Sequence, residues 1–378
     1  MFRVDGIQRQ ESFDDPASAD EFKKTIDRFD AAYALSLLHR KQAADETVPT
    51  LREYTNRYLD PTQGLLTGIE PGTRAGYVRA ADRSFLPMLG PIPIDQVTKA
   101  DVGRWLAWQE VQPAMRGKGK TVAPKTIKNY HAILSSVLAS AVEEKLRPDN
   151  PAYRTRLPKG IREEPVFLSV DEFTTLLHFI PDRHERFVYF LAGTGCRWGE
   201  ATALMWSAVD LRSRPASIRV EQAWKKGETG APVLKHPKSA KSRRTVSIPD
   251  DIAAALGAPK RADDFVFPST TGSHLWYGRF RHSVWNPAVE MAMDAALCRS
   301  EGLTPLTRRP TIHDLRHSHA SWLIASGAPL PYIQARLGHE SIQTTVNVYG
   351  HLVPDVHRQM ADVVGSTLAG VRSLRELT

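Results

Sequence analysis

A proline-rich segment near the middle of this chain constrains its fold most. Residues 147–165 (RPDNPAYRTRLPKGIREEP) contain four prolines and several basic residues. Proline lacks a backbone N–H donor and interrupts helices, so the segment is expected to be an extended basic linker. A chain of 378 residues is also long for one hydrophobic core. We therefore expect two or three domains, with a boundary within residues 153–165.

The part of the chain before this linker is expected to be helical. Across residues 48–152, apolar residues recur at three- and four-residue spacings, most clearly over Lys125–Leu146. Thr98 followed by Asp101 predicts a capping box at the start of another helix. Residues 1–45 predict a strand and one helix, over about Ser18–Leu38, which is too little to fold alone.

The part after the linker is expected to mix helices with a small sheet. Ser169 with Glu172 predicts a second capping box. Two β-rich segments, Ser217–Ala223 and Arg244–Ile248, flank a basic turn region and predict a hairpin or small sheet. The predicted fold class is therefore mostly α with a small antiparallel β-sheet. Further helices are expected over residues 184–193, 197–206, 250–256, 276–297, 312–326 and 330–337.

The charge of the chain favours a polyanionic partner. The formal net charge is +8 and the pI is about 9.4, which suits nucleic acid first and an anionic membrane second. Many basic proteins bind neither. No apolar run approaches the ~20 residues of a membrane span, and the acidic first thirty residues do not resemble a signal peptide. Two cysteines cannot make a disulfide framework, so a reducing cytoplasm is expected.

One helix carries polar residues that fit a nucleic-acid partner. Lys125, Lys128 and Asn129 lie on its polar side near the N-terminus. A solvated helix face explains these three residues about as well as a DNA contact does, so both interpretations are kept.

Two segments in the second half supply cations. Gly193–Glu200 (GTGCRWGE) places Arg197 at a helix start, where backbone N–H groups also favour an anion. Taken alone, such an Arg is more often a surface salt-bridge residue. Lys235–Pro249 (KHPKSAKSRRTVSIP) has five Lys and Arg residues and no acid. A solvated hairpin tip would explain that charge cluster by itself.

Two further segments supply histidines, an arginine and a tyrosine. In Thr311–Leu323 (TIHDLRHSHASWL), His313 and Arg316 share one helix face. His317 follows His313 by four residues, a spacing that suits a metal but lacks a supporting third ligand. In Leu337–Leu352 (LGHESIQTTVNVYGHL), His339 is expected on a loop after a glycine helix end. Tyr349, near the end of the next short helix, would ordinarily be a core or interface aromatic.

Together these residue types suit phosphoryl transfer by a tyrosine. Such chemistry depends on positioning and on neutralising charge at the phosphate oxygens, for which paired Arg residues can substitute for Mg²⁺. A tyrosine hydroxyl, with an unperturbed pKa near ~10, must be activated by cations or a base such as His. A Lys can protonate the leaving oxygen. No metal-ligand set and no phosphate-binding loop appears in the sequence, so no metal or other cofactor is expected.

In this order and spacing the four segments resemble the tyrosine recombinases, and phage and mobile-element integrases most closely. The shared features are the Arg, a Lys on a β-hairpin, HxxR, LGH, and a Tyr ten residues after that His. The resemblance implies that Arg197 and Arg316 hold the scissile phosphate and that Tyr349 forms a 3′-phosphotyrosine. It also implies that His313 acts as base or hydrogen-bond partner and that His339 stabilises the transition state.

The basic hairpin contains two candidates for the general acid. The resemblance favours Lys238, which follows a proline and precedes a small hydroxyl residue, but Lys241 lies only three residues away. Lys241, Arg243 and Arg244 are then expected to contact DNA. Glu200 is expected to orient Arg197 or the helix rather than to join the chemistry.

The resemblance also implies a domain plan, a C-shaped two-domain clamp around duplex DNA. Residues 48–152 would form the core-type DNA-binding domain and residues 166–353 the catalytic domain. Residues 1–45 resemble only the final strand and helix of an arm-type DNA-binding domain, so independent arm-site binding is in doubt. Residues 354–378 would be a C-terminal tail that the resemblance allows to be exchanged between subunits.

The expected function is site-specific recombination of attachment sites in double-stranded DNA, by a homotetramer on synapsed duplexes. An excision factor and a host DNA-bending protein are further partners that the resemblance allows. The expected location is the cytoplasm of a bacterial host, at the nucleoid. Two alternatives remain open, a type IB-like topoisomerase and a DNA-binding regulator with an inactive recombinase core.

Overall fold

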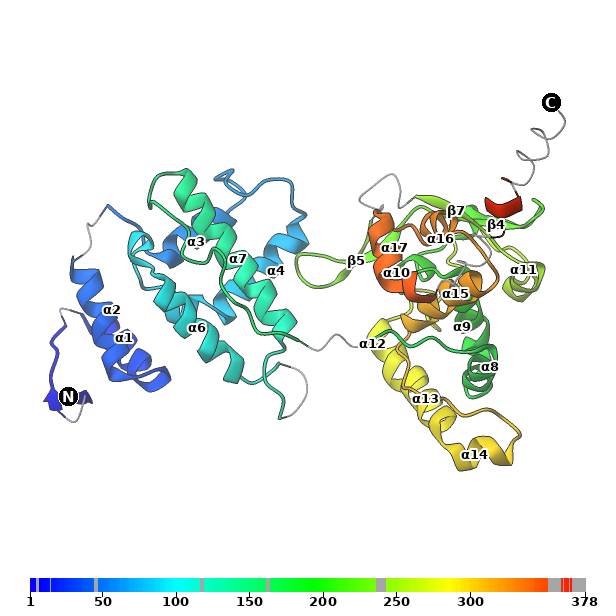
Figure 1. Ribbon diagram of the computed structural model, residues 1–378, viewed down its shortest axis with the longest axis horizontal. Helices are drawn as coiled ribbons and strands as arrows, with labels where there is room; N and C mark the ends of the chain where they lie inside the picture. The colour runs from blue at the N-terminus through cyan, green and yellow to red at the C-terminus, as the bar shows by residue number, and fades with distance from the viewer. Residues whose placement is uncertain are drawn as a thin grey trace. The chain divides into compact units, whose positions relative to one another are not determined.

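In the computed structural model (Figure 1), the chain divides into two compact units. One is built from residues 1–162 and 227–231, and the other from residues 163–226 and 232–378. The structure describes residues 1–4, 7–13, 15–43, 47–115, 119–160, 164–235 and 243–352, with 362, 364–366 and 368.

The first unit is helical apart from one short hairpin. Its buried core is contributed by all of its longer helices from α2 onward. The elements are β1 (Phe2–Val4), β2 (Ile7–Arg9), α1 (Pro16–Arg28), α2 (Ala31–Ala43), α3 (Leu51–Leu59), α4 (Pro71–Arg83), α5 (Leu86–Leu89), a 3₁₀ turn η1 (Ile94–Gln96), α6 (Lys99–Val111) and α7 (Pro124–Glu143).

The start of the chain differs from the strand and single helix predicted for residues 1–45. β1 and β2 pair as an antiparallel hairpin, and the helical pattern is divided between α1 and α2. The backbone N–H of Phe29 ends α1 by bonding to Thr25, and the Asp30 carboxylate accepts the N–H of Tyr33 at 2.6 Å at the start of α2. The break between the two helices is made by a side-chain cap and not by a change in the apolar pattern. The apolar spacing therefore continues across the break and does not reveal it.

Helix α2 packs into the first unit rather than standing apart from it. Tyr33 is buried and donates its hydroxyl to the backbone oxygen of Met88 at 2.6 Å. Arg40 donates to the buried Asp101 at 2.7 Å. Asp101 also completes the predicted capping box with Thr98, which is confirmed.

Arg147 belongs to this unit and not to an extended linker, which corrects our interpretation of the first residues after α7. Its side chain is only 3% exposed. It donates to the backbone oxygens of Ile94 at 2.5 Å, Val97 at 2.9 Å and Asp149 at 2.5 Å. One guanidinium therefore holds the segment after α7 against the turn before α6.

We predict that Arg147→Ala lowers the stability of the first unit by about 3 kcal/mol, because it leaves buried carbonyls without their donor. Arg156→Ala is the matched control, since Arg156 is exposed in the following segment. Thermal denaturation should show a lower transition for the first variant alone. Equal transitions for both variants would contradict a structural role for Arg147.

The second unit combines helices with small antiparallel sheets. Its helices, with a 3₁₀ turn η2 (Trp206–Ala208) and a π-helical segment η4 (Arg281–Trp285), surround the main core. The helices are α8 (Val170–His178), α9 (Asp182–Thr194), α10 (Trp198–Ala201), α11 (Asp250–Leu256), α12 (Tyr277–Phe280), α13 (Asn286–Met293), α14 (Ala295–Ser300), α15 (Asp314–Ala325), α16 (Leu330–Leu337) and α17 (Ile342–Tyr349), followed by a 3₁₀ turn η5 (Gly350–Leu352).

The two β-rich segments pair in one small antiparallel sheet, as predicted, and the chain between them forms a second sheet. β4 (Ser217–Val220) lies between β3 (Val209–Asp210) and β7 (Arg244–Ser247), with Ile218 opposite both Val209 and Val246. Between β4 and β7 the chain forms a second hairpin, β5 (Ala223–Lys226) with β6 (Pro232–Lys235). The basic turn at 236–242, which contains Lys238 and Lys241, lies outside the described residues.

Two of the expected helices are shorter or more divided in the structure. The segment expected as a helix over 197–206 forms only α10, and the segment over 276–297 is divided into α12, η4, α13 and α14. Asp294 accepts two backbone N–H groups at the start of α14 and so separates it from α13. Among the described helices, none is both long enough and apolar enough to cross a membrane.

Helix α15 has the central position for the site. It packs against α9 on one side and α16 on another, and α16 packs against α17 (Figure 1). The predicted capping box of Ser169 and Glu172 at the start of α8 is confirmed. The Glu172 carboxylate also accepts the N–H and hydroxyl of Thr307, which ties α8 to the loop that leads into α15.

Candidate active site

A left-handed glycine begins the site at the end of α9. Gly195 has φ of 65°, and a Cβ there would lie 2.7 Å from His319 and 2.9 Å from Leu337. Only glycine combines this backbone conformation with that approach. The chain therefore turns sharply and places Arg197 at the N-terminus of α10, as the sequence predicts.

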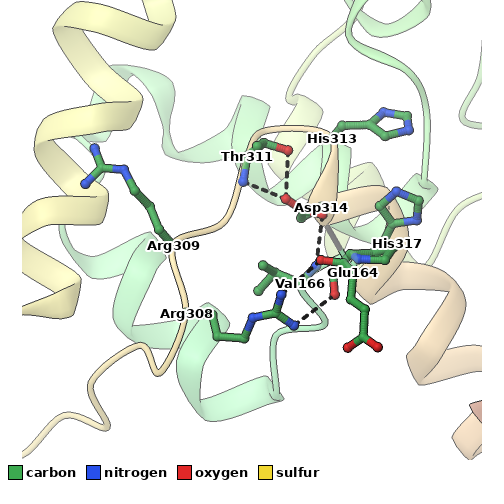
Figure 2. Close-up of a pocket in the computed structure, with 9 residues that line it drawn as sticks. Glu164, Val166, Arg308, Arg309, Thr311, His313, Asp314 and His317 are labelled. Atoms are coloured by element: carbon green, nitrogen blue, oxygen red, sulfur yellow. Dashed lines mark hydrogen bonds between the residues drawn. The ribbon is translucent and has the colours of Figure 1, made fainter. Parts of the chain in front are cut away.

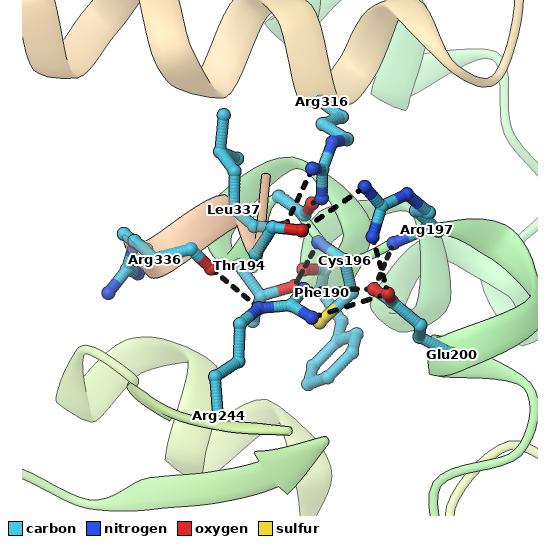
Figure 3. A network of polar contacts seen from close by, with 11 residues as sticks. Phe190, Thr194, Cys196, Arg197, Glu200, Arg244, Arg316, Arg336 and Leu337 are labelled. Atoms are coloured by element: carbon cyan, nitrogen blue, oxygen red, sulfur yellow. Dashed lines mark hydrogen bonds and ion pairs between the residues drawn. The ribbon is translucent and has the colours of Figure 1, made fainter. Parts of the chain in front are cut away.

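Arg316 is buried at the centre of the site. It donates to the backbone oxygens of Gly195 and Leu337, both at 2.7 Å (Figure 3). Burial, reinforced by the nearby charge of Arg197, lowers the pKa of Arg316 to about 9, so the guanidinium is still protonated at neutral pH. This single side chain connects the end of α9, helix α15 and the end of α16.

Glu200 fixes two more arginines around this centre. Its carboxylate accepts the side chain and the backbone N–H of Arg197, each at 2.8 Å, and the guanidinium of Arg244 at 2.9 and 3.2 Å (Figure 3). Burial acts to raise the pKa of Glu200, but the bonded Arg244 together with Arg197 and Arg316 lowers it to about 2. Glu200 therefore orients Arg197, in the manner expected.

The position of Arg244 corrects its predicted role as a DNA contact. Its side chain is 5% exposed and donates to Glu200 and to the backbone oxygen of Arg336 at 2.7 Å. A guanidinium committed to these internal acceptors is not a surface phosphate contact. Arg243, its neighbour, is exposed.

His339 follows the second left-handed glycine of the site, Gly338. Its Nδ1 lies 2.9 Å from the hydroxyl of Thr345, and its ring is parallel to that of Tyr349 at 6.3 Å. Burial, with the charges of Arg316 and Arg197, lowers the pKa of His339 to about 3. The imidazole is therefore neutral at physiological pH, so one ring nitrogen donates a hydrogen bond and the other accepts one.

Tyr349 is the last residue of α17 and is fully buried. Its hydroxyl lies 2.8 Å from Nδ1 of His317, and its ring meets Phe167 edge-on. Burial raises the pKa of Tyr349 to about 12, although Arg316 and Arg197 act in the opposite direction. The hydroxyl is thus protonated at neutral pH and held by one histidine.

His313 lies beside this pair at the start of α15. Its ring centroid is 4.9 Å from that of His317, and burial together with Arg316 lowers its pKa. His313, Asp314 and His317 line an open cavity of about 510 Å³ (Figure 2). Among the described residues, no group of three or more His, Cys, Asp or Glu side chains could hold a metal ion.

The structure thus brings together Arg197, Arg316, His313, His339 and Tyr349, which lie far apart in the sequence. It does not describe Lys238 or Lys241. In the other unit, the three predicted DNA contacts on α7, Lys125, Lys128 and Asn129, are exposed.

Sequence reasoning missed the contact of His317 with Tyr349. The residue attracted attention only as a weak metal ligand at four residues from His313. Its position directly after Arg316 in the sequence is the signal that could have identified it.

The fold is that of DNA-bound recombinases of known structure. A Tn1549 transposon integrase solved with circular intermediate DNA superposes with a TM-score of 0.63 at 20% identity, covering 84% of this chain and 99% of that one. A lambda integrase tetramer solved on a Holliday junction superposes with a TM-score of 0.53 at 18% identity, covering 80% of this chain and 78% of that one. The mostly helical fold with small antiparallel sheets is confirmed.

Residues 166–355 match the model of the phage integrase family, and the chain belongs to that family, the tyrosine recombinases that break and rejoin DNA. The ICEBs1 integrase of Bacillus subtilis is 29% identical over 250 residues, which are 65% of this chain and 66% of that protein. The integrase of Mycobacterium phage L5 is 26% identical over 307 residues, 79% of this chain and 74% of that protein.

We predict that the second unit loses stability in acid through Glu200. Because the folded pKa of about 2 lies below the value of 4.5 expected when unfolded, the contribution is complete above pH 4.5 and disappears as pH falls through 2. Glu200→Gln should cost about 3 kcal/mol at pH 7 and flatten the loss of stability between pH 5 and 2. Glu221→Gln, at an exposed ion pair, is the control for pH-dependent denaturation. If Glu200→Gln lost stability between pH 5 and 2 as steeply as wild type, the acid sensitivity would not arise from Glu200.

Proposed function

We propose that this protein is a site-specific recombinase that integrates and excises a phage or other mobile element, cutting DNA through a covalent 3′-phosphotyrosine at Tyr349. The observation that carries the proposal is the convergence of Arg197, Arg316, His339 and Tyr349 around one buried centre. A DNA-binding protein without chemistry would not need a shielded tyrosine hydroxyl beside two arginines.

The two arginines suit the non-bridging oxygens of a scissile phosphate. Arg316 is fixed by two backbone carbonyls, and Arg197 is fixed by Glu200. Cations held in place before the substrate arrives stabilise a pentacoordinate phosphate without reorganisation. His339 is neutral and lies next to the backbone carbonyls that these arginines bind. It would supply a further hydrogen bond to the non-bridging oxygens of the phosphate.

In the proposed reaction, the oxygen of Tyr349 attacks phosphorus, and the bond from phosphorus to the 5′ oxygen breaks. The leaving oxygen takes a proton from a general acid, for which we propose Lys238. A 5′ hydroxyl, from the same strand or a partner strand, then attacks the phosphotyrosine and releases the tyrosine. Because the ester is conserved in the intermediate, rejoining needs no nucleotide.

The proposed partners are two double-stranded attachment sites, held by a homotetramer in the bacterial cytoplasm. The support is by analogy, since the structures similar to this one include an integrase on circular intermediate DNA and a tetramer on a Holliday junction. We propose residues 48–152 as the core-site DNA-binding domain, with Lys125, Lys128 and Asn129 on its contact surface. Residues 166–353 would be the catalytic domain, and the two would close around the duplex.

We predict that Tyr349→Phe binds attachment-site DNA normally and forms no covalent complex, because it keeps the buried ring and removes only the hydroxyl. A nicked suicide substrate traps the complex for detection on a denaturing gel. A surviving adduct would place the nucleophile elsewhere. Relaxation of a supercoiled plasmid that has no attachment site would instead indicate a topoisomerase.

The general acid can be assigned with a 5′-bridging phosphorothiolate, whose sulfur leaves without a proton. We predict that Lys238→Ala is slow on normal DNA and close to wild type on the sulfur-substituted strand. Lys241→Ala should lower affinity and reduce the salt dependence by about one unit of slope, without rescue. Rescue of Lys241→Ala alone would move the acid to that residue.

A further inference from the structure

The hydroxyl of Tyr349 is bonded to a histidine other than the one that the sequence suggested as base. Nδ1 of His317 lies 2.8 Å from the tyrosine oxygen. The ring of His313 lies perpendicular to the His317 ring at 4.9 Å between centroids. A base must be within hydrogen-bond reach of the proton that it removes, and His317 meets this requirement in the structure.

We propose that His317 is the catalytic base that takes the proton from Tyr349 during DNA cleavage and returns it during rejoining. The inference rests on the proposed function, since it takes Tyr349 as the nucleophile.

Burial of the tyrosine makes a protein acceptor necessary. Tyr349 is fully buried, next to the rings of Phe167 and His339, so bulk water does not reach its hydroxyl directly. The proton released on attack therefore has to pass to a neighbouring side chain. His317 is that neighbour, and as the residue after Arg316 on α15 it is fixed to the same helix as the phosphate-binding cation.

The groups around His317 keep its imidazole neutral, so that it can accept a proton. Burial, followed by the influence of His313 and Arg316 on the same helix, lowers its pKa to about 4, whereas Asp314 acts in the opposite direction. The ring is therefore neutral at pH 7 with one nitrogen unprotonated.

Other charged and titratable groups face the same region from neighbouring elements. The open cavity beside His317 is also lined by Glu164 from the segment before α8 and by Arg308 and Arg309 from the loop before α15. Tyr349 and His339 face the ring from α17 and from the loop before it. The Asp314 carboxylate is held by Thr311 and by the backbone N–H of Val166, so it stays close when the ring becomes charged.

The proposed proton transfer balances in both directions. As the tyrosine oxygen forms its bond to phosphorus, its O–H bond breaks and the proton moves to Nδ1 of His317, giving an imidazolium. When a 5′ hydroxyl later displaces the tyrosine, the imidazolium returns that proton to the tyrosine oxygen. Transfer concerted with attack avoids a free tyrosinate, which its high pKa would make costly.

His317→Asn separates proton transfer from positioning. The Asn amide stands where Nδ1 stands, so it can still accept a hydrogen bond from Tyr349 but cannot be protonated near neutral pH. Single-turnover formation of the covalent complex on a suicide substrate should fall by about 10²–10⁴-fold, with DNA affinity unchanged. His178→Ala, a half-exposed histidine paired with Glu301, should react like wild type.

The dependence of the cleavage rate on pH distinguishes loss of a base from a purely structural defect, which would not change that dependence. In His317→Asn, attack has to proceed through the small tyrosinate fraction, which grows about tenfold per pH unit below the pKa of about 12, so the rate should rise by that factor from pH 7 to 9, whereas wild type stays nearly flat. The 5′-bridging phosphorothiolate should not restore this variant, because the lost group acts on the nucleophile. A more acidic fluorotyrosine at position 349 should partly restore it.

Several outcomes would overturn the proposal. A wild-type rate in His317→Asn, a slow rate without pH dependence, or rescue by the sulfur substrate would each exclude His317 as the base. His317→Ala, measured alongside, should be at least as slow. Failure of the proposed function is separate, because it would appear as a covalent adduct in Tyr349→Phe.

Discussion

The structure of the site depends on the buried ion pairs of Glu200. Removing a guanidinium from water is costly unless charged or carbonyl acceptors replace the water. Glu200 compensates Arg197 and Arg244 together, and backbone oxygens of Gly195 and Leu337 compensate Arg316. One carboxylate therefore faces three arginines, and the remaining positive charge favours an anion at this centre. A phosphodiester has the charge and the oxygens to occupy that position.

The same contacts explain why distant segments of the sequence need one another. The Arg316 side chain, on α15, reaches carbonyls that become available only because α9 and α16 end in left-handed glycines. Arg244, on β7, reaches the last turn of α16 through the backbone of Arg336. Substituting either glycine would strain the backbone and would also shift the carbonyl oxygens that bind Arg316. The arginine would then be misplaced for binding an anion.

The sequence predicts those structural features that depend on residues close to one another in the chain. The capping boxes at Thr98 and Ser169, and Arg197 at a helix start, each depend on residues within four positions. The burial of Arg244 and the bonds of Arg147 to Ile94 and Val97 depend on partners elsewhere in the chain, and side-chain type alone does not reveal them. His317 is the clearest case, because its partner lies 32 residues away and its helix spacing suggested a different chemistry.

The acidity of Tyr349 is set by two opposing influences. Burial raises its pKa to about 12, more than Arg316 and Arg197 lower it, and the bonded His317 is neutral. Without DNA, the pair is therefore an uncharged hydrogen bond with a poor nucleophile. In the proposed mechanism, a phosphate bound between the arginines would add negative charge and so stabilise an imidazolium at His317. It would also place phosphorus where the tyrosine oxygen can form a bond as its proton leaves. Activation of the tyrosine would in this way be coupled to the arrival of its own substrate, and the high pKa of the buried hydroxyl would protect it from reaction elsewhere.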